Sequence, residues 1–167
     1  MLLDAFARVS RVRPGARLVI VGDGPARREL ERTAPAGTVF FGEARGEQLA
    51  ALYASADVFC FPSTTDTFGQ VLLEAGASGL PVIAAAAGGA LELVAHGRTG
   101  LLVDADDPGL LAAALVELAE LPIRRAALGA AGLAAARART WETAIAQLAG
   151  TYRRVLGLES RPALAAA

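Results

Sequence analysis

Short apolar runs alternate with helix-forming segments along most of this chain, and glycine-containing turns separate them. Such alternation predicts parallel strands joined by crossover helices, in an α/β fold with helices on both faces of a Rossmann-like sheet. The expected strands are residues 17–21, 38–41, 57–61, 81–84 and 101–103. The expected helices are residues 2–10, 26–32, 46–55, 69–78, 90–95, 108–120, 122–138 and 141–156. Right-handed crossovers place the turns that follow the strands at one sheet edge, where open α/β sheets bind ligands.

Composition narrows the class of protein. Hydrophobic residues make up 54% of the 167 residues and the net charge is −1. These values favour a folded domain and give no electrostatic case for nucleic acid or a basic membrane patch. We expect one domain over residues 1–157, a frayed tail over 158–167 and a cytoplasmic location, with peripheral association at the inner membrane face left open. The single cysteine, Cys60, lies in an apolar run and reads as a core residue.

The first predicted element is a helix, whereas a doubly wound sheet usually begins with a strand. We therefore expect this fold to lack its first strand within the chain, with that strand and a loop lying upstream. The C-terminal third is expected to be helical throughout.

The stretch from Phe61 to Val94 holds the most informative residues. An apolar strand enters a polar turn, which opens a helix with free N–H groups at its N-terminus. We expect the amides of that terminus to bind an anion, because unpaired N–H groups and the helix dipole both favour negative charge. They belong to Phe68, Gly69, Gln70 and Val71.

Two carboxylates flank this anion site. Asp66 precedes the helix, and Glu74 follows two turns into it, within a mostly apolar segment where a carboxylate needs partners. Carboxylates accept hydrogen bonds from sugar hydroxyls, so the pair beside an anion site suits a nucleotide sugar. Two structural readings stay open: Asp66 as a cap near the helix N-terminus, and Glu74 as a surface carboxylate or ion-pair member.

Four further features are ambiguous or structural. The turn Gly22-Asp23-Gly24-Pro25 is either a tight turn or a close backbone approach to ligand, and Glu92, after Gly88-Gly89, is either a ligand contact or a solvated residue. His96 reads as a turn residue, and Trp141 as a core residue that anchors the last helix on the sheet. With a single histidine and a single cysteine, a structural zinc site is not expected.

Several of these segments resemble one enzyme family. The matching stretches are FPSTTDTFGQVLLEAGASGLPVIA, GGALELV, GRTGLLV, RLVIVGDGP, TVFFG and LYASADVFCFPS. Together they resemble the C-terminal donor-binding domain of GT-B fold, GT4-family retaining glycosyltransferases, over residues 2 to about 156. The TDTFG variant is most similar to the branch that transfers mannose or a related hexose to lipid or saccharide acceptors.

The resemblance implies roles for matching positions. The expected donor is a nucleotide-diphosphate sugar, a GDP- or UDP-sugar, with no other cofactor and no bound metal. Glu74 would hold the ribose hydroxyls, and Asp66 would act at the donor sugar near the reacting carbon. The amides of residues 68–71 would bind the diphosphate, and Phe41 and Gly42 would lie beside the base.

The resemblance also implies what this chain does not supply. Asp66 stands where most of the family has glutamate, and the family's phosphate-binding arginine and lysine would precede Met1, as would the N-terminal acceptor domain. We expect weak donor binding and no sugar transfer by this chain alone. The strands at residues 17–21 and 57–61 either pair directly or leave unpaired edges, and unpaired edges are expected to cause self-association. Two alternatives remain: a non-catalytic module that pairs with a separate N-terminal half, and another GT-B enzyme such as an epimerase.

Overall fold

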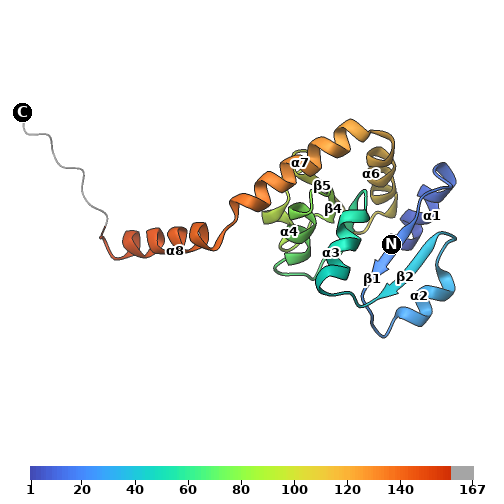
Figure 1. The fold of residues 1–167 in the computed structure, drawn as a ribbon, viewed down its shortest axis with the longest axis horizontal. Coiled ribbons are helices and arrows are strands. Elements are labelled where there is room, and N and C mark those ends of the chain that lie inside the picture. Colours follow the sequence, from blue (N-terminus) through green and yellow to red (C-terminus); the bar gives the residue numbers. More distant parts are fainter. Residues whose placement is uncertain (159–167) are drawn as a thin grey trace, which may run out of the picture. The chain divides into compact units, whose positions relative to one another are not determined.

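The computed structural model describes residues 1–158, and its contacts divide the chain into two compact units, residues 1–136 and the residues from Arg137 onward. The described residues form five strands and eight helices, which alternate from α1 to α6 and are followed by α7 and α8 (Figure 1). The strands are β1 Leu18–Val21, β2 Thr38–Gly42, β3 Phe59–Phe61, β4 Val82–Ala85 and β5 Gly100–Val103. The helices are α1 Leu2–Val12, α2 Arg27–Thr33, α3 Gly46–Ser55, α4 Gln70–Ala77, α5 Ala90–Leu93, α6 Pro108–Glu120, α7 Pro122–Ala138 and α8 Trp141–Val155.

All strand pairs are parallel, but the strands form two sheets. One sheet contains β1 and β2, and the other has the order β3-β4-β5. Within the described residues β1 and β3 do not pair, so of the two arrangements left open by the sequence, unpaired edges are the one observed. The strand between Asp57 and Phe61 is also shorter than predicted, because Phe59 is the first residue whose backbone joins β4.

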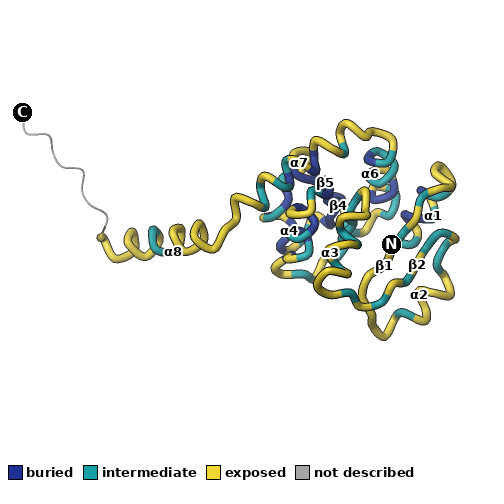
Figure 2. The backbone as a smooth tube through the Cα atoms, in the orientation of Figure 1, coloured by how far each residue is buried: buried dark blue, intermediate teal, exposed yellow. Residues whose placement is uncertain are grey.

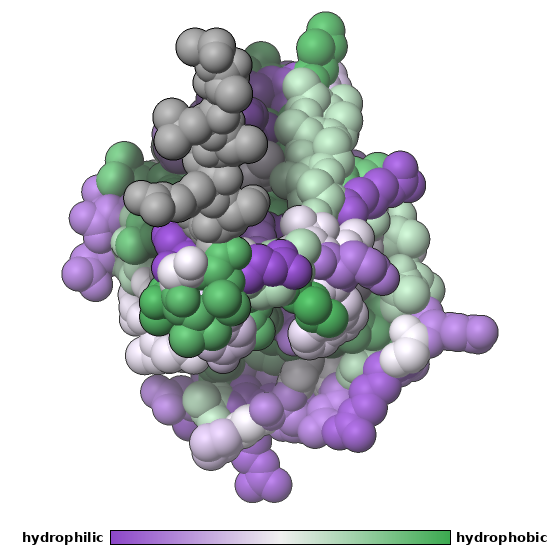
Figure 3. All heavy atoms as spheres, turned by 90° about the vertical axis from the view of Figure 1, so that its left-hand side faces the viewer, coloured by the Kyte–Doolittle hydropathy of each residue, from purple (hydrophilic) through white to green (hydrophobic). Residues whose placement is uncertain are grey.

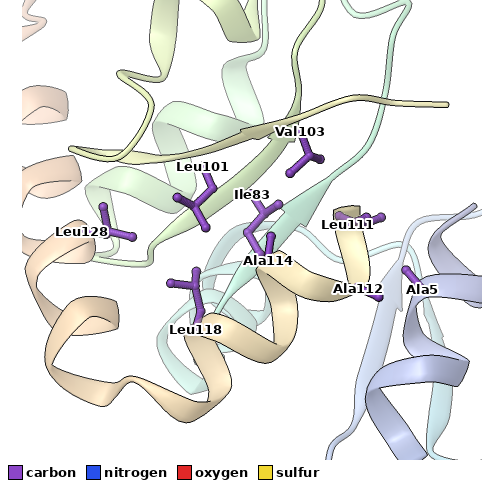
Figure 4. Close-up of a cluster of buried hydrophobic side chains, with 9 residues drawn as sticks. All are labelled: Ala5, Ile83, Leu101, Val103, Leu111, Ala112, Ala114, Leu118 and Leu128. Carbon is purple, nitrogen blue, oxygen red and sulfur yellow. The ribbon is translucent and has the colours of Figure 1, made fainter. Parts of the chain in front are cut away.

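The three-stranded sheet has a hydrophobic core on each face. On one face Ile83, Leu101 and Val103 pack with side chains from α6 and α7, as the close-up in Figure 4 shows. On the other face Val82 and Ala84 pack against a cluster with residues from α4 and α5. Figure 2 shows the deepest burial around β4 and β5, and Figure 1 shows α4 and α6 on either side of them. The prediction of helices on both faces is therefore confirmed for this sheet.

Glycines let α7 pack closely on the layer that contains α4. A Cβ atom on Gly129 of α7 would overlap the carbonyl oxygen of Gly79, and one on Gly76 of α4 would lie 3.4 Å from the Gly132 oxygen. No larger residue at position 129 fits without a shift of backbone. This contact seats α7 over the turn that connects α4 to β4.

The two-stranded sheet is less well covered. The exposed fractions of Val19, Val21, Val39 and Phe41 lie between 40% and 48%, and these residues alternate with less exposed neighbours in both strands. One face of this sheet therefore presents apolar side chains to solvent.

Helix α8 belongs to the second unit and carries apolar side chains on its surface. Trp141 is 83% exposed within it, and its expected role as an anchor on the sheet stays a prediction. Ile145, Leu148 and Tyr152 follow it at helical spacing and are also exposed, which gives α8 an apolar stripe. Figure 3 shows hydrophobic side chains exposed among hydrophilic ones on the face turned to the viewer. Of the tail predicted to be frayed, residues 159–167 lie outside the described residues.

Candidate functional site

The turn between β3 and α4 is folded around the Asp66 carboxylate. Its Oδ1 atom accepts a hydrogen bond from the amide of Phe68 at 2.9 Å and a shorter one from the amide of Gly69. Gly69 precedes the helix in the left-handed region, with φ of 70°, where a side chain would be strained. The capping interpretation of Asp66 is therefore observed, and two of the four amides expected to bind a diphosphate hold this carboxylate instead.

The next two amides are available. Leu72 donates its amide hydrogen to the carbonyl oxygen of Gly69 at 2.9 Å, whereas the amides of Gln70 and Val71 have no hydrogen-bond partner among the described residues. They form the first turn of α4, where the helix dipole is positive. Two amides are thus available to bind an anion, and they lie beside the Asp66 carboxylate, which accepts hydrogen bonds from the amides of Phe68 and Gly69.

Glu74 is half-buried on α4 and is held by a neutral partner. The Tyr53 hydroxyl donates a hydrogen bond to Oε2 of Glu74 at 3.1 Å. Burial, followed by the nearby Glu74 charge, raises the pKa of Tyr53 to about 12, so its hydroxyl is protonated at neutral pH. No ion pair of the described residues includes Glu74, which argues against the structural ion-pair interpretation there.

The loop that follows β4 braces the loop that follows β3. The amide of Gly89 donates to the carbonyl oxygen of Asp66 at 3.2 Å. A Cβ atom on Gly88 would overlap that oxygen, and one on Gly89 would lie 2.8 Å from the Phe68 carbonyl carbon. Both loops leave the carboxyl ends of paired strands, so they lie at one edge of the sheet as expected, and ligand binding at this edge stays a prediction. Glu92 is exposed on α5, and its role stays a prediction.

The residues expected beside a base lie at the end of the two-stranded sheet. Phe41 is 40% exposed, and Gly42 ends β2 with its carbonyl oxygen 2.7 Å from the amide of Gly22. The turn after β1 therefore lies beside Gly42, as the common edge predicts. Among the described residues, no hydrogen bond or ion pair joins Phe41 or Gly42 to Asp66 or Glu74.

Arg27 holds the end of the two-stranded sheet in place. It pairs with Asp23 at 3.2 Å and Glu31 at 2.8 Å, and it donates to the Phe40 carbonyl oxygen at 3.3 Å. Asp23 also accepts the amide of Gly24 at 2.7 Å, and both interpretations of Gly22 to Pro25 stay predictions. With two carboxylate partners, this guanidinium is already neutralised.

Two other singled-out residues have structural roles. The Nδ1 atom of His96 accepts the amide of Leu102 at 3.0 Å, and the residue directly precedes the turn of residues 97–99, which agrees with a structural role. Burial raises the pKa of the Cys60 thiol to about 12, which agrees with a core position and keeps it protonated. Within residues 1–158, no group of three metal-ligating side chains is assembled.

Sequence reasoning missed Tyr53. It predicted the helix at residues 46–55 and quoted this tyrosine within a matching stretch, but it assigned the hydroxyl no partner. The signal was available, because a tyrosine on an apolar helix normally finds a hydrogen-bond partner for its hydroxyl when buried. A carboxylate on a neighbouring apolar helix is such a partner.

Comparison with known proteins identifies the family of this chain. Residues 1–120 match the family described as glycosyl transferases group 1. The chain belongs to this family. It is 46% identical over 152 residues to a GDP-mannose-dependent alpha-mannosyltransferase of Mycolicibacterium smegmatis, covering 91% of this chain and 40% of that protein. A Corynebacterium glutamicum protein of the same description is 38% identical, covering 89% of this chain and 36% of that protein.

Solved structures give the same fold. HepE of Anabaena, in complex with UDP-glucose, superposes with a TM-score of 0.78 at 30% identity, covering 92% of this chain and 44% of that chain. This group 1 glycosyltransferase chain therefore has a GT-B type α/β fold with parallel sheets flanked by helices. It spans about two fifths of the length of the curated relatives described above. No helix within residues 1–158 is long and apolar enough to cross a membrane.

Proposed function

We propose that this chain is the donor-binding part of a retaining glycosyltransferase and binds a nucleotide-diphosphate sugar. One observation carries the proposal: α4 holds both Glu74, a half-buried carboxylate bonded to the neutral Tyr53 hydroxyl of α3, and two amides, those of Gln70 and Val71, that have no hydrogen-bond partner among the described residues. A carboxylate suits the hydroxyls of a sugar or ribose, and helix amides suit a phosphate. The family membership supports the reaction class.

The proposed roles follow from the donor's chemistry. Glu74 accepts hydrogen bonds from the ribose hydroxyls. The amides of Gln70 and Val71 bind the diphosphate, joined by those of Phe68 and Gly69 once Asp66 releases them. Amides and a helix dipole aimed at a leaving diphosphate stabilise its developing charge, so the proposed mechanism uses no metal ion. Phe41 and Gly42 lie beside the base in this proposal.

Asp66 has to change partners in the proposed donor complex. Its carboxylate now holds the amides of Phe68 and Gly69. For these amides to reach the diphosphate, Asp66 must release them, and the hydroxyls of the donor sugar offer it new donors. Asp66 is thus the proposed catalytic carboxylate near the reacting carbon.

The donor is proposed to be a GDP-sugar, with a UDP-sugar as the second candidate. GDP-mannose dependence of two relatives favours the first, and UDP-glucose bound to a solved neighbour favours the second. The acceptor is proposed to be a lipid or a saccharide. Its binding site is assigned to an N-terminal domain of a longer protein, so this chain alone is expected to transfer no sugar.

Calorimetric titration of the chain with GDP, UDP and ADP, and then with their sugars, tests the proposal. We expect saturable but weak binding of GDP or UDP, because the unpartnered groups at this helix terminus, the amides of Gln70 and Val71, are neutral. A hydrogen bond between two charged groups is roughly twice as strong as one between neutral groups. Failure of all three nucleotides to bind at millimolar concentration would overturn the proposal.

A further inference from the structure

One hydrogen bond links the proposed ribose-binding carboxylate to a helix that carries no other site residue. Tyr53, near the end of α3, donates its hydroxyl to Oε2 of Glu74 on α4 at 3.1 Å. Among the described residues this is the one hydrogen bond to the Glu74 side chain. The orientation of the carboxylate therefore depends on Tyr53.

The Tyr53 ring is itself held in place. Its centroid lies 5.5 Å from that of Phe59 with the planes tilted by 54°, and Phe59 stacks on Phe61 at 6.3 Å. Both phenylalanines belong to β3, and all three rings pack against the hydrophobic cluster on that face of the sheet. Aromatic pairs of this geometry are favourable beyond the area they bury. The sheet thus fixes the ring, and the ring fixes the hydroxyl.

A neutral hydrogen-bond donor leaves more of the Glu74 carboxylate available to a ligand than a cationic partner would. An arginine at this point would neutralise the carboxylate and occupy both oxygens, as bidentate pairs do. Tyr53 takes one lone pair of one oxygen and leaves Oε1 without a protein partner in the described residues. With a pKa of about 12, the hydroxyl is protonated at neutral pH and acts there only as a donor toward the carboxylate.

We propose that Tyr53 is a positioning residue that orients the Glu74 carboxylate toward the ribose hydroxyls of the bound nucleotide. The inference rests on the proposed function, because it takes Glu74 as the ribose ligand. It adds that the contribution of the ribose hydroxyls to the free energy of nucleotide binding depends on the Tyr53 hydroxyl. That dependence separates positioning from a contribution to folding alone.

The test compares two ligands in three proteins. GDP and 2′,3′-dideoxy-GDP are titrated calorimetrically into the wild-type chain, Tyr53→Phe and Tyr152→Phe. Phenylalanine at position 53 keeps the ring stack on Phe59 and removes the hydroxyl alone. Tyr152 is the chain's other tyrosine, lies exposed on α8 and provides the matched control. Thermal unfolding of each protein confirms that it is folded at the temperature of the titration.

The expected result is a loss that depends on the ribose hydroxyls. Tyr53→Phe should bind GDP about tenfold more weakly than wild type, the effect of one hydrogen bond to a charged group. It should bind the dideoxy nucleotide as the wild type does, and Tyr152→Phe should match wild type with both ligands. In a Glu74→Ala background, Tyr53→Phe should cause no further loss.

Three results would overturn the inference. Equal GDP affinity of wild type and Tyr53→Phe would show that the hydroxyl does not matter for the nucleotide. An equal loss for GDP and the dideoxy nucleotide would assign Tyr53 a structural role only. If the wild-type chain binds neither nucleotide, the proposed function fails and this inference with it, whereas the first two results leave the proposed function intact.

Discussion

Asp66→Asn separates the charge of the Asp66 side chain from its capping role. The asparagine keeps an Oδ1 atom that can accept the amides of Phe68 and Gly69, which Asp66 now holds, but it carries no charge. If the diphosphate of a nucleotide binds at the neighbouring amides of Gln70 and Val71, it binds beside this charge. Removal of the charge should therefore tighten GDP binding.

The spacing of the backbone sets the size of this effect. Amides two positions apart are separated by roughly 6 Å, given about 3.8 Å between consecutive Cα atoms. Two unit charges at that distance repel by about 0.7 kcal/mol in water and by about 3 kcal/mol at an effective dielectric constant of about 20. Asp66 is only partly buried, so solvent screening holds the expected gain near 1 kcal/mol, or roughly fivefold in affinity.

Calorimetric titration of GDP at low and high salt measures the gain, which should shrink at high salt because the repulsion is screened. Asp107→Asn is the matched control: Asp107 caps α6 through the amides two and three positions later, at 2.7 and 3.2 Å, as Asp66 does in its own turn. That variant should bind GDP as wild type does. Unchanged or weaker GDP binding by Asp66→Asn would refute the placement of the diphosphate at this helix terminus.

Two further predictions concern stability and association. Gly129→Ala should lower the free energy of unfolding by about 1–2 kcal/mol, because overlap with the Gly79 carbonyl oxygen outweighs the gain in helix propensity. Gly150→Ala on α8 is the control and should cost nothing, since a Cβ there meets nothing within 4 Å. Thermal unfolding that ranks the two variants the other way would contradict the packing of α7. Light scattering should show self-association of the chain, because β1 and β3 leave edges unpaired and Val19, Val21 and Val39 are exposed. Val39→Lys should reduce this self-association. A monodisperse monomer of high thermal stability would argue against the prediction.

The elements were predictable because glycine and proline mark their ends. Gly22, Gly42 and Gly97 all have positive φ: Gly22 follows β1, Gly42 is the last residue of β2, and Gly97 lies in the turn before β5. Pro108 and Pro122 begin α6 and α7. The helical boundaries after residue 107 agree with prediction to within one residue. Local chemistry decides such boundaries, so one sequence is sufficient to locate them.

The pairing of strands and the burial of surfaces were less predictable. Pairing depends on which strands are present together, and the sequence alone allowed β1 and β3 either to pair or to remain apart. Burial of Trp141 likewise depends on what packs against α8, which belongs to the second unit, so its anchoring role stays a prediction.

The candidate site was predictable in its residues but not in its contacts. Asp66 and Glu74 were identified from their spacing and from the apolar helix around Glu74. Whether Asp66 turns toward a ligand or back to its own loop is a difference of side-chain rotamer, which sequence does not encode. The Tyr53 contact joins residues 21 positions apart and follows only from how α3 and α4 pack on β3.

Calorimetric titration of GDP into the wild-type chain and Glu74→Ala is the most direct test of the central claim, that Glu74 and the α4 amides form a nucleotide-sugar donor site. The account predicts saturable binding to wild type and a loss of about tenfold or more in the variant, since each ribose hydroxyl loses a charged acceptor. Equal affinity of the two proteins for GDP, with both folded by thermal unfolding, would contradict the claim.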